Sequence, residues 1–348
     1  MKNKNITAVL YALLAAVFYA VNTPFSKLLL KNVPATFMAA FLYIGAGLGI
    51  GIMYLFHIKS EPAAERLTRK DLPYTIGMIL LDILAPIFLM LGISIGSASN
   101  ASLLGNFEIV ATTLIALLIF KESVSGKLWT AVALITLSSI ILSFDTNGSL
   151  QFSYGSLFVI LATVCWGFEN NCTRQISNKS AYEIVLLKGI FSGGGSFVIA
   201  MVIGEKIPGI RYILTAMLLG FIAYGLSIFL YIKAQKYLGA AKTSAYYAVA
   251  PFVGAFLAFA INGEVLTGTY FAALIIMLLG SAFVVYDTLM KHHSHSHTHT
   301  VCHTHNGTTH THIITHEHIH SHLTDSEKHL HKHMNFIKSN EHLLAHGK

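Results

Sequence analysis

Four ionisable residues stand inside long apolar stretches of this 348-residue chain: Asp82, Glu108, Glu169 and Lys188. A charge in the bilayer core costs about 2.5–3.5 kcal/mol or more, so such residues normally face a protein interior and mark ion or substrate pathways. Glu169 and Lys188 lie at similar depths on consecutive stretches, which predicts an ion pair. Three acids and one base leave a negative balance that suits proton binding or an amine-bearing substrate. We predict that Asp82 or Glu108 is the coupling or substrate site; the alternative is a protonated, hydrogen-bonded helix contact.

The apolar stretches that carry these residues identify an integral membrane protein. The chain is 54% hydrophobic and 11% charged, against about 25% charged residues in a soluble domain. A helix needs about 20 apolar residues to cross a bilayer. The sequence therefore predicts an all-α membrane protein with ten transmembrane helices, near residues 7–29, 35–56, 73–95, 98–120, 127–144, 154–174, 182–203, 212–233, 241–262 and 266–287.

Lysine and arginine residues predict the orientation of these helices. If the N-terminus is cytoplasmic, fourteen of them fall in or beside cytoplasmic loops, and only four lie outside: Lys27, Lys31, Lys206 and Arg211. Positive residues concentrate in short cytoplasmic loops, so we expect both termini in the cytoplasm and the protein in a cell (plasma or inner) membrane. This scatter accounts for the net charge of +7 without a nucleic-acid partner.

The chain contains an internal repeat, because a shift of 142 residues lays 97–145 on 239–287 without gaps. The identical pairs include Glu122 with Glu264, Gly126 with Gly268, and Asp145 with Asp287. Each half holds five stretches, an odd number, so the second half must be inserted upside down. Inverted repeats are typical of secondary transporters, whose substrate site lies between the halves. We expect a first five-helix repeat over 1–145, an inverted second repeat over 146–290, and a tail over 291–348.

A second shift, of 147 residues, pairs polar positions of the two halves. Asn22 then meets Glu169, whose neighbour is Asn170, and Tyr19 meets Trp166 one helical turn away. These residues either line a central cavity from both halves or act as interhelical hydrogen bonds.

Two adjacent tyrosines, Tyr246 and Tyr247, precede Pro251. Adjacent helical residues point about 100° apart, so at least one tyrosine faces the bundle. The proline leaves a backbone carbonyl free one turn earlier, which either bends the helix or contacts substrate. The candidate substrate or coupling residues are Asn22, Asp82, Glu108, Trp166, Glu169, Asn170, Lys188, Tyr246 and Tyr247.

Two segments, "ASLLGNFEIVATTLIALLIFKESVSG" and "TSAYYAVAPFVGAFLAFAINGEVLTG", carry a family resemblance. They resemble the drug/metabolite transporter (DMT) superfamily, and within it the EamA-type family. The resemblance implies a ten-helix carrier and does not select among amino acids, nucleotide precursors, sugars and drugs as substrates. Pro251, Glu264 and Gly268 fit the family pattern of a mid-span proline, a glutamate, and a glycine that starts the next helix. In the first half, Ile109 stands in the place of the proline and Glu108 precedes it.

Glu122 and Glu264 each stand at a membrane face, a few residues before the next helix. These helices are expected to begin near Gly126 and Gly268. A carboxylate there caps free backbone N–H groups and meets the positive end of the helix dipole. We therefore expect both glutamates to be structural.

The segment 291–348 holds eighteen of the nineteen histidines. Imidazole suits zinc, nickel and similar transition metals, and histidine-rich tracts are typical of metal binding. The candidate ligands are His292, His293, His295, His297, His299, Cys302, His303 and His305. The tail is polar and predicted to be disordered. It regulates the carrier as a metal buffer or sensor, feeds metal to a metal-exporting pore, or has no transport role. The protease-like spacing of His316, Glu317 and His320 is a chance match in so histidine-rich a tract.

Together these features predict a secondary active exporter of a small polar metabolite, such as an amino acid, that works by alternating access and is coupled to protons. It needs no cofactor. The alternative is a divalent-metal carrier with a metal-collecting tail, although the apolar stretches hold no histidine and only Cys165 and Cys172 as sulfur ligands. An enzyme is not expected, because no nucleophile–base or metal constellation falls in these stretches. The sequence leaves the oligomeric state open.

Overall fold

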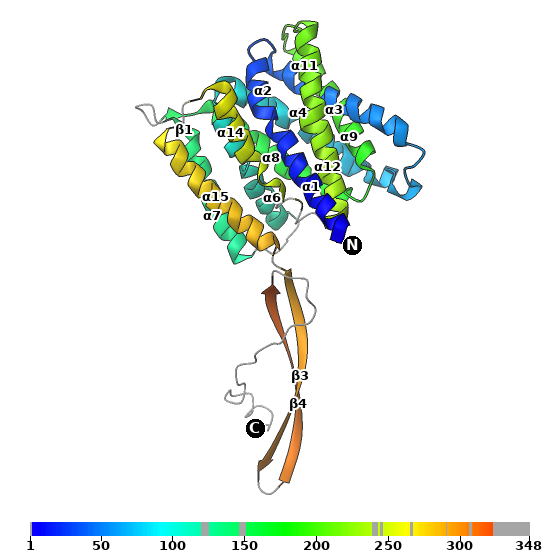
Figure 1. Ribbon diagram of the computed structural model, residues 1–348, viewed down its shortest axis with the longest axis vertical. Helices are drawn as coiled ribbons and strands as arrows, with labels where there is room; N and C mark the ends of the chain where they lie inside the picture. The colour runs from blue at the N-terminus through cyan, green and yellow to red at the C-terminus, as the bar shows by residue number, and fades with distance from the viewer. Residues whose placement is uncertain are drawn as a thin grey trace. The chain divides into compact units, whose positions relative to one another are not determined.

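The computed structural model describes residues 2–119, 125–145, 151–238, 243, 246–264, 267–289, 291–305 and 308–322 (Figure 1). The helices of the first half are α1 (Lys2–Ala20), α2 (Asn22–Leu29), α3 (Ala35–His57), α4 (Leu72–Ile95), α5 (Ala98–Leu104), α6 (Phe107–Leu118) and α7 (Gly126–Ser143). Two 3₁₀ turns, η1 (Ala63–Glu65) and η2 (Arg69–Asp71), lie between α3 and α4.

The second half begins after a two-residue strand pair, β1 (Phe144–Asp145) with β2 (Gln151–Phe152). Its helices are α8 (Tyr154–Gln175), α9 (Ala181–Leu187), α10 (Gly193–Val202), α11 (Ile210–Gly220), α12 (Ser227–Leu238), α14 (Ala250–Asn262) and α15 (Gly268–Leu289). Two π-helical segments, η3 (Lys188–Ser192) and η4 (Phe221–Leu226), join α9 to α10 and α11 to α12. As predicted, α7 begins at Gly126 and α15 at Gly268.

Each of the ten predicted apolar stretches contains at least one of these helices. Among the described residues, seven helical spans are long and apolar enough to cross a membrane: Ile6–Leu29, Ala35–His57, Ala63–Ile95, Gly126–Ser143, Ala181–Val202, Ile210–Leu238 and Gly268–Asp287. The other three stretches differ for visible reasons. The α5–α6 stretch is interrupted, α8 ends in a polar segment around Glu169, and α14 has 13 residues. The chain is thus a multi-pass helical membrane protein.

Several of the predicted single helices are interrupted. The helix α1 ends before Val21, three residues ahead of Pro24, whose ring nitrogen has no hydrogen to donate. The stretch of α5 and α6 breaks at Gly105 and Asn106. Under the 142-residue shift Asn106 corresponds to residue 248, and residues 248–249 form a turn before α14. The two halves are therefore interrupted at matching places. Pro251 therefore stands in the first turn of α14 and not in mid-helix as predicted, because a proline is tolerated where no helical partner is lost.

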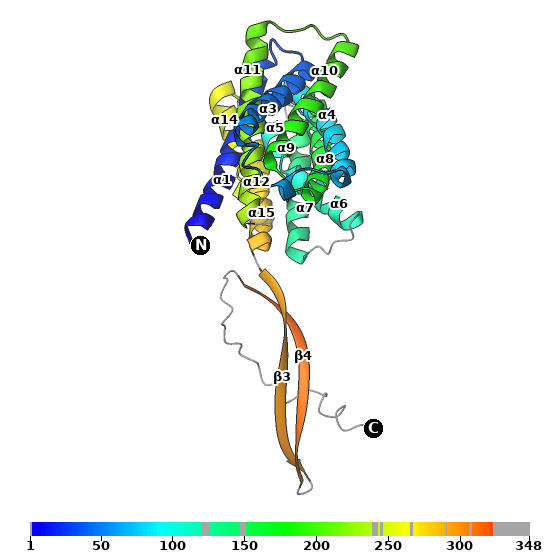
Figure 2. The ribbon, with the colours of Figure 1, turned by 90° about the vertical axis from the view of Figure 1, so that its right-hand side faces the viewer.

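Glycines let α3 pack backbone to backbone against the second half (Figure 2). A Cβ on Gly189 would collide with the backbone nitrogen of Gly47, and one on Gly220 with the carbonyl oxygen of Leu42. A Cβ on Gly47 would stand 2.7 Å from the backbone nitrogen of Ile190. This close approach brings η3 and η4 against α3.

The tail is a separate unit from residue 290 onward. We predicted disorder, whereas over its described residues the structure gives two antiparallel strands, β3 (Lys291–His305) and β4 (Thr308–His322). The register sets His293 opposite His320 and His295 opposite His318. Alternation of histidine with threonine, serine and isoleucine has the period of a strand, although a lone two-stranded hairpin is marginally stable in water.

Candidate functional site

Asp82, Glu169 and Lys188 form a buried cluster, which we call the central ion cluster. The Nζ atom of Lys188 lies 2.9 Å from Oε1 of Glu169 and 3.1 Å from Oδ2 of Asp82. The predicted Glu169–Lys188 pair is therefore present, and Asp82 joins it. Asp82 is fully buried and the other two residues are at most 5% exposed. With all three groups ionised the cluster carries one net negative charge.

The cluster brings together the two halves of the chain. Asp82 comes from α4 of the first half, whereas Glu169 comes from α8 and Lys188 from η3 of the second. Lys188 is the first residue of a π-helical segment, a rare conformation that is frequent at functional sites.

Hydrogen bonds extend the cluster across the bundle. The Tyr43 hydroxyl donates to Oδ1 of Asp82 at 3.0 Å. The ring of Tyr43 lies 5.0 Å from that of Tyr224, whose hydroxyl accepts a hydrogen bond from Asn22 Nδ2 at 3.0 Å. Ser26 in turn donates to Asn22 Oδ1. Asn22 is thus connected to the cluster through Tyr224 and Tyr43. It is not connected through Glu169, the residue with which it aligns in the internal repeat.

Glu108 and Asn170 form a second, partly buried polar contact. Asn170 Nδ2 donates to Glu108 Oε1 at 2.5 Å and so links α6 to α8. Asn170 follows Glu169 directly in the chain, so this contact lies beside the central ion cluster. Glu108 also stands in the first turn of α6, just after the break at Asn106, whose buried Oδ1 has no hydrogen-bond partner among the described residues. Two of the predicted candidates, Glu108 and Asn170, therefore meet each other.

A small cavity of about 20 Å³ lies where the interrupted helices converge. Its walls include Ala20 beside the α1–α2 break, Gly105 at the α5–α6 break, and Ala250 at the start of α14. Tyr19 and Trp166, which the sequence assigned either to a central cavity or to interhelical contacts, also line it. This volume accommodates about one water molecule, so the described residues enclose no metabolite-sized space at this point.

Tyr247 is connected to the site and its neighbour Tyr246 is not. The Tyr247 hydroxyl lies 3.3 Å from Ser227 Oγ, and its ring packs 5.9 Å from the ring of Tyr19. The structure gives no hydrogen bond between Tyr246 and another described residue. Of this pair, the inward-facing tyrosine is therefore Tyr247.

Glu264 is a helix cap, but on a different helix from the one predicted. Its carboxylate accepts hydrogen bonds from the backbone of Ala98 (2.7 Å) and Ser99 (2.9 Å) and from the Ser97 hydroxyl (2.7 Å), at the start of α5. It therefore caps a helix of the other half, and not α15, because the inverted repeat brings α14 against α5. Burial alone would raise the pKa of Glu264, but hydrogen bonds from Ser99, Ser97 and Ala98 outweigh burial and hold it below its usual range. Glu122 lies outside the described residues.

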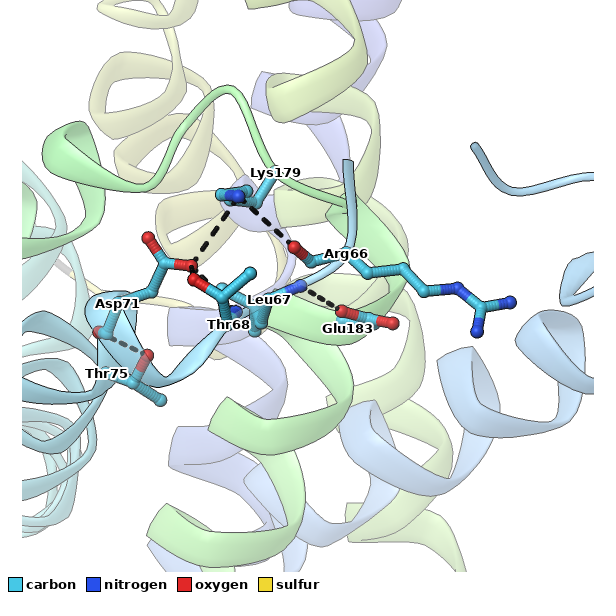
Figure 3. Close-up of polar contacts among 7 residues, drawn as sticks. All are labelled: Arg66, Leu67, Thr68, Asp71, Thr75, Lys179 and Glu183. Atoms are coloured by element: carbon cyan, nitrogen blue, oxygen red, sulfur yellow. Dashed lines mark hydrogen bonds and ion pairs between the residues drawn. The ribbon is translucent and has the colours of Figure 1, made fainter. Parts of the chain in front are cut away.

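The loop before α4 docks on the start of α9, at the face predicted to be cytoplasmic (Figure 3). Glu183 accepts hydrogen bonds from the Leu67 backbone at 2.6 Å and from the Tyr54 hydroxyl at 2.7 Å. The Ser180 backbone donates to the Glu65 carbonyl at 2.6 Å. These contacts join the first half to the second.

Lys179 strengthens the same contact, which we call the 65–71 latch. Its Nζ donates to the Arg66 carbonyl at 3.2 Å and lies 3.6 Å from Asp71 Oδ2 (Figure 3). Asp71 also completes a capping box with Thr68 at the start of η2, which leads directly into α4. The latch thus fixes the entry of α4, the helix that carries Asp82.

An equivalent contact closes the opposite face. Glu205, between α10 and α11, accepts hydrogen bonds from the backbone of Thr36 (3.2 Å) and Phe37 (2.9 Å) at the start of α3. The α10–α11 connection corresponds to the α3–α4 connection in the other repeat, and α3 corresponds to α9. The first half therefore holds the N-terminus of α9, and the second half holds the N-terminus of α3.

The sequence did not single out Tyr43, Tyr224 or Thr173, which complete the site. Thr173 donates to Glu169. A tyrosine hydroxyl in an apolar stretch needs a buried partner, which is the signal that would have identified Tyr43 and Tyr224. Among the described side chains, no group of three or more histidine, cysteine or acidic residues is placed to hold a metal ion. The side chains of the tail histidines lie outside this description.

A helical membrane protein of two matching halves, with a buried polar site between them, belongs to the class of secondary transporters. The chain belongs to the EamA-like transporter family, whose model matches residues 6–144 and 153–286. This family is part of the DMT superfamily. The protein is therefore a multi-pass membrane transporter, and the predicted family is confirmed.

Two further similarities agree with this assignment. An "Uncharacterized transporter" of Methanothermobacter thermautotrophicus is 25% identical over 296 residues, which cover 78% of this chain and 84% of that protein. A solved structure described as "Crystal structure of protein" matches with a TM-score of 0.61 and 14% identity, over 81% of this chain and 96% of the other. The latter similarity supports the fold alone.

Proposed function

We propose that this transporter exports a small polar metabolite, such as an amino acid, in exchange for protons and by alternating access. The proposal also includes ten membrane crossings, with both termini in the cytoplasm. It places the protein in the plasma or inner membrane. The single observation that carries it is the buried, net-negative cluster of Asp82, Glu169 and Lys188 between the two repeats. Charges so costly in a membrane are retained where they bind an ion or a substrate.

Proton coupling is assigned to Asp82 or Glu108. Both are carboxyl groups in the helical bundle, and together with Glu169 they outnumber Lys188 by three to one. A carboxylate in such surroundings gains or loses a proton when its solvation changes. Opening the bundle to one side changes that solvation and releases the proton to the water on that side.

We assign alternating access to the two contacts that join the halves at opposite faces. The 65–71 latch joins the halves on the predicted cytoplasmic face, and Glu205 joins them on the opposite face. Opening to either side requires one of these contacts to break while the other holds. The close backbone contact of Gly47 with Gly189 is a suitable pivot, because it brings two helices together without side chains between them.

For the tail we propose a regulatory role, in which its histidines bind zinc or nickel and adjust the transport rate. The opposed histidines of β3 and β4 support this assignment, because alternate positions of neighbouring strands share one face of a hairpin.

The test is transport by purified protein in proteoliposomes. Uptake of labelled amino acids and of zinc or nickel is measured for the full chain and for a version that ends at Lys291. Amino-acid transport that survives truncation, with metal changing only its rate, is expected. Metal transport that is lost with the tail would instead make the protein a metal carrier.

A further inference from the structure

We propose that Lys188 occupies the place of the cargo: a primary ammonium group of the transported molecule displaces the lysine ammonium and binds between Asp82 and Glu169. The ligand class is thus a protonated primary amine, as in an amino acid or a small amine. The inference deepens the proposed function and rests on the protein being a carrier, but not on the cargo being an amino acid.

The two carboxylates form a site suited to this group. Lys188 Nζ lies within 3.1 Å of an oxygen of each, and both acids are almost completely buried. Tyr43 holds the remaining oxygen of Asp82, and Thr173 contacts Glu169. Since these hydroxyls orient the carboxylates independently of Lys188, the site keeps its shape when one ammonium replaces another. A primary ammonium supplies three N–H donors, whereas a quaternary ammonium supplies none.

The conformation of Lys188 provides a way for it to leave. It is the first residue of η3, and a π-helical turn contains one residue more than an α-helical turn. Conversion of η3 to regular α-helix turns one flank relative to the other by about 100°. Gly189 and Gly193 lie against the backbone of α3, so the residues after Lys188 are anchored, and Lys188 stands at the N-terminal end of the π-helical segment. Tyr224, whose ring packs against that of Tyr43, also lies on a π-helical segment, η4.

The charge balance links departure of the lysine to arrival of the cargo. If Lys188 leaves alone, Asp82 and Glu169 remain buried without a counter-ion, which is strongly unfavourable. If an ammonium or protons take its place, the balance is preserved. The long aliphatic stem of lysine allows its ammonium to extend toward water at the membrane face, and α9 begins at Ala181, about 10 Å along the helix axis from Lys188.

The test is chemical rescue in the full-length protein with Lys188→Ala. Propylammonium supplies the three carbons and the nitrogen that this substitution removes. Thermal unfolding in detergent is followed as propylammonium is added. We expect a lower unfolding midpoint for Lys188→Ala than for the wild type, and a saturable rise with propylammonium that neither 1-propanol nor tetramethylammonium reproduces.

Two control variants make the rescue specific. The triple variant Lys188→Ala, Asp82→Asn, Glu169→Gln has no charged site and should not respond. Lys236→Ala removes an exposed lysine paired with Glu65 and should not respond either. No stabilisation of Lys188→Ala, or equal stabilisation of the triple variant, would overturn the proposal.

A second measurement uses the wild type and remains decisive if Lys188→Ala cannot be purified. Transport by proteoliposomes is competed with propylammonium and with N-acetylpropylamine, which lacks the charge. Equal inhibition by both compounds contradicts the proposal, and selective inhibition by propylammonium supports it. If no amino acid is transported but the rescue succeeds, the cargo named in the proposed function is wrong and the ammonium site stands.

Discussion

The Nζ atom of Lys188 lies 3.1 Å from Oδ2 of Asp82, so a lysine of the second repeat neutralises a fully buried aspartate of the first. Asp82 Oδ2 accepts no hydrogen bond from the described residues. The ion contact with Lys188 is thus the interaction that compensates its burial. A contact of this kind couples the two repeats through charge as well as through packing.

Removing the lysine alone should destabilise the protein strongly. We expect Lys188→Met to lower the free energy of unfolding by about 3–5 kcal/mol, because two carboxylates are left buried without a counter-ion. The triple variant with Asp82→Asn and Glu169→Gln should recover much of this loss, since no charge then remains to compensate. Equilibrium unfolding of the variants in detergent measures both effects. Equal stability of the single and triple variants would contradict the cluster as described.

Glu264→Gln should weaken the protein in a pH-dependent way. The pKa of Glu264 is depressed in the folded protein, so its stabilisation is present above the ordinary glutamate pKa of about 4.3 and is lost as the pH falls through the folded value. At neutral pH we expect a loss of about 1–2 kcal/mol, typical of a helix cap. The difference from the wild type should shrink in acid. A difference that is constant with pH would mean that the charge of Glu264 contributes nothing.

Breaking the 65–71 latch should loosen the predicted cytoplasmic face. In Glu183→Ala the Leu67 amide loses its acceptor. We expect faster hydrogen exchange at Leu67, measured by mass spectrometry of the 60–70 segment. Lys236→Ala is the matched control, because its exposed ion pair with Glu65 is worth at most about 1 kcal/mol. Unchanged exchange in Glu183→Ala, or an equal change in the control, would remove the latch from the account.

Two glycines of the same region should respond differently to alanine. A methyl group at Gly189 collides with the backbone of Gly47, whereas one at Gly194 meets nothing within 4 Å. Gly189→Ala should therefore cost about 1–3 kcal/mol of stability through overpacking, and Gly194→Ala should cost little. Thermal unfolding midpoints of the two variants test the close approach of α3 and η3. Equal midpoints would contradict it.

Truncation after Lys291 should abolish binding of zinc or nickel by the tail. Isothermal titration of the full chain and the truncated chain with zinc measures the loss. Retention of the same zinc affinity after truncation would place the metal ligands in the helical unit and remove the tail from the proposed regulation.

Most of the fold could be predicted from the residue types and from the spacing of the internal repeat. All ten apolar stretches contain helices, and the depth argument identified the Glu169–Lys188 pair. Depth fixes position along a helix but not rotation about it, so the third member, Asp82, was not assigned to the pair. The tyrosines that join Asp82 to Asn22 were also missed. Aromatic residues are common in apolar helices, and the hydrogen-bond partners of these two tyrosines come from distant segments.

The pattern of apolar residues did not predict where the helices are interrupted. Pro24 and Asn106 stand close to two of the breaks, but the stretches around them were interpreted as continuous helices. The π-helical turn at Lys188 depends on packing against α3. Glu264 was recognised as a cap from its type and position. Its actual partner, α5, follows from how the inverted halves interlock, a long-range property that one segment does not contain.

The most direct test of the central claim is accumulation driven by a pH gradient in proteoliposomes. Labelled amino acids are supplied to the wild type, to Glu108→Gln and to Asp82→Asn, with and without an imposed gradient. The account predicts that the gradient drives accumulation of at least one amino acid by the wild type. It also predicts that one of the two variants loses this dependence while it still exchanges substrate downhill. Transport whose rate and pH profile are unchanged in both variants would contradict the role of these two carboxylates in coupling.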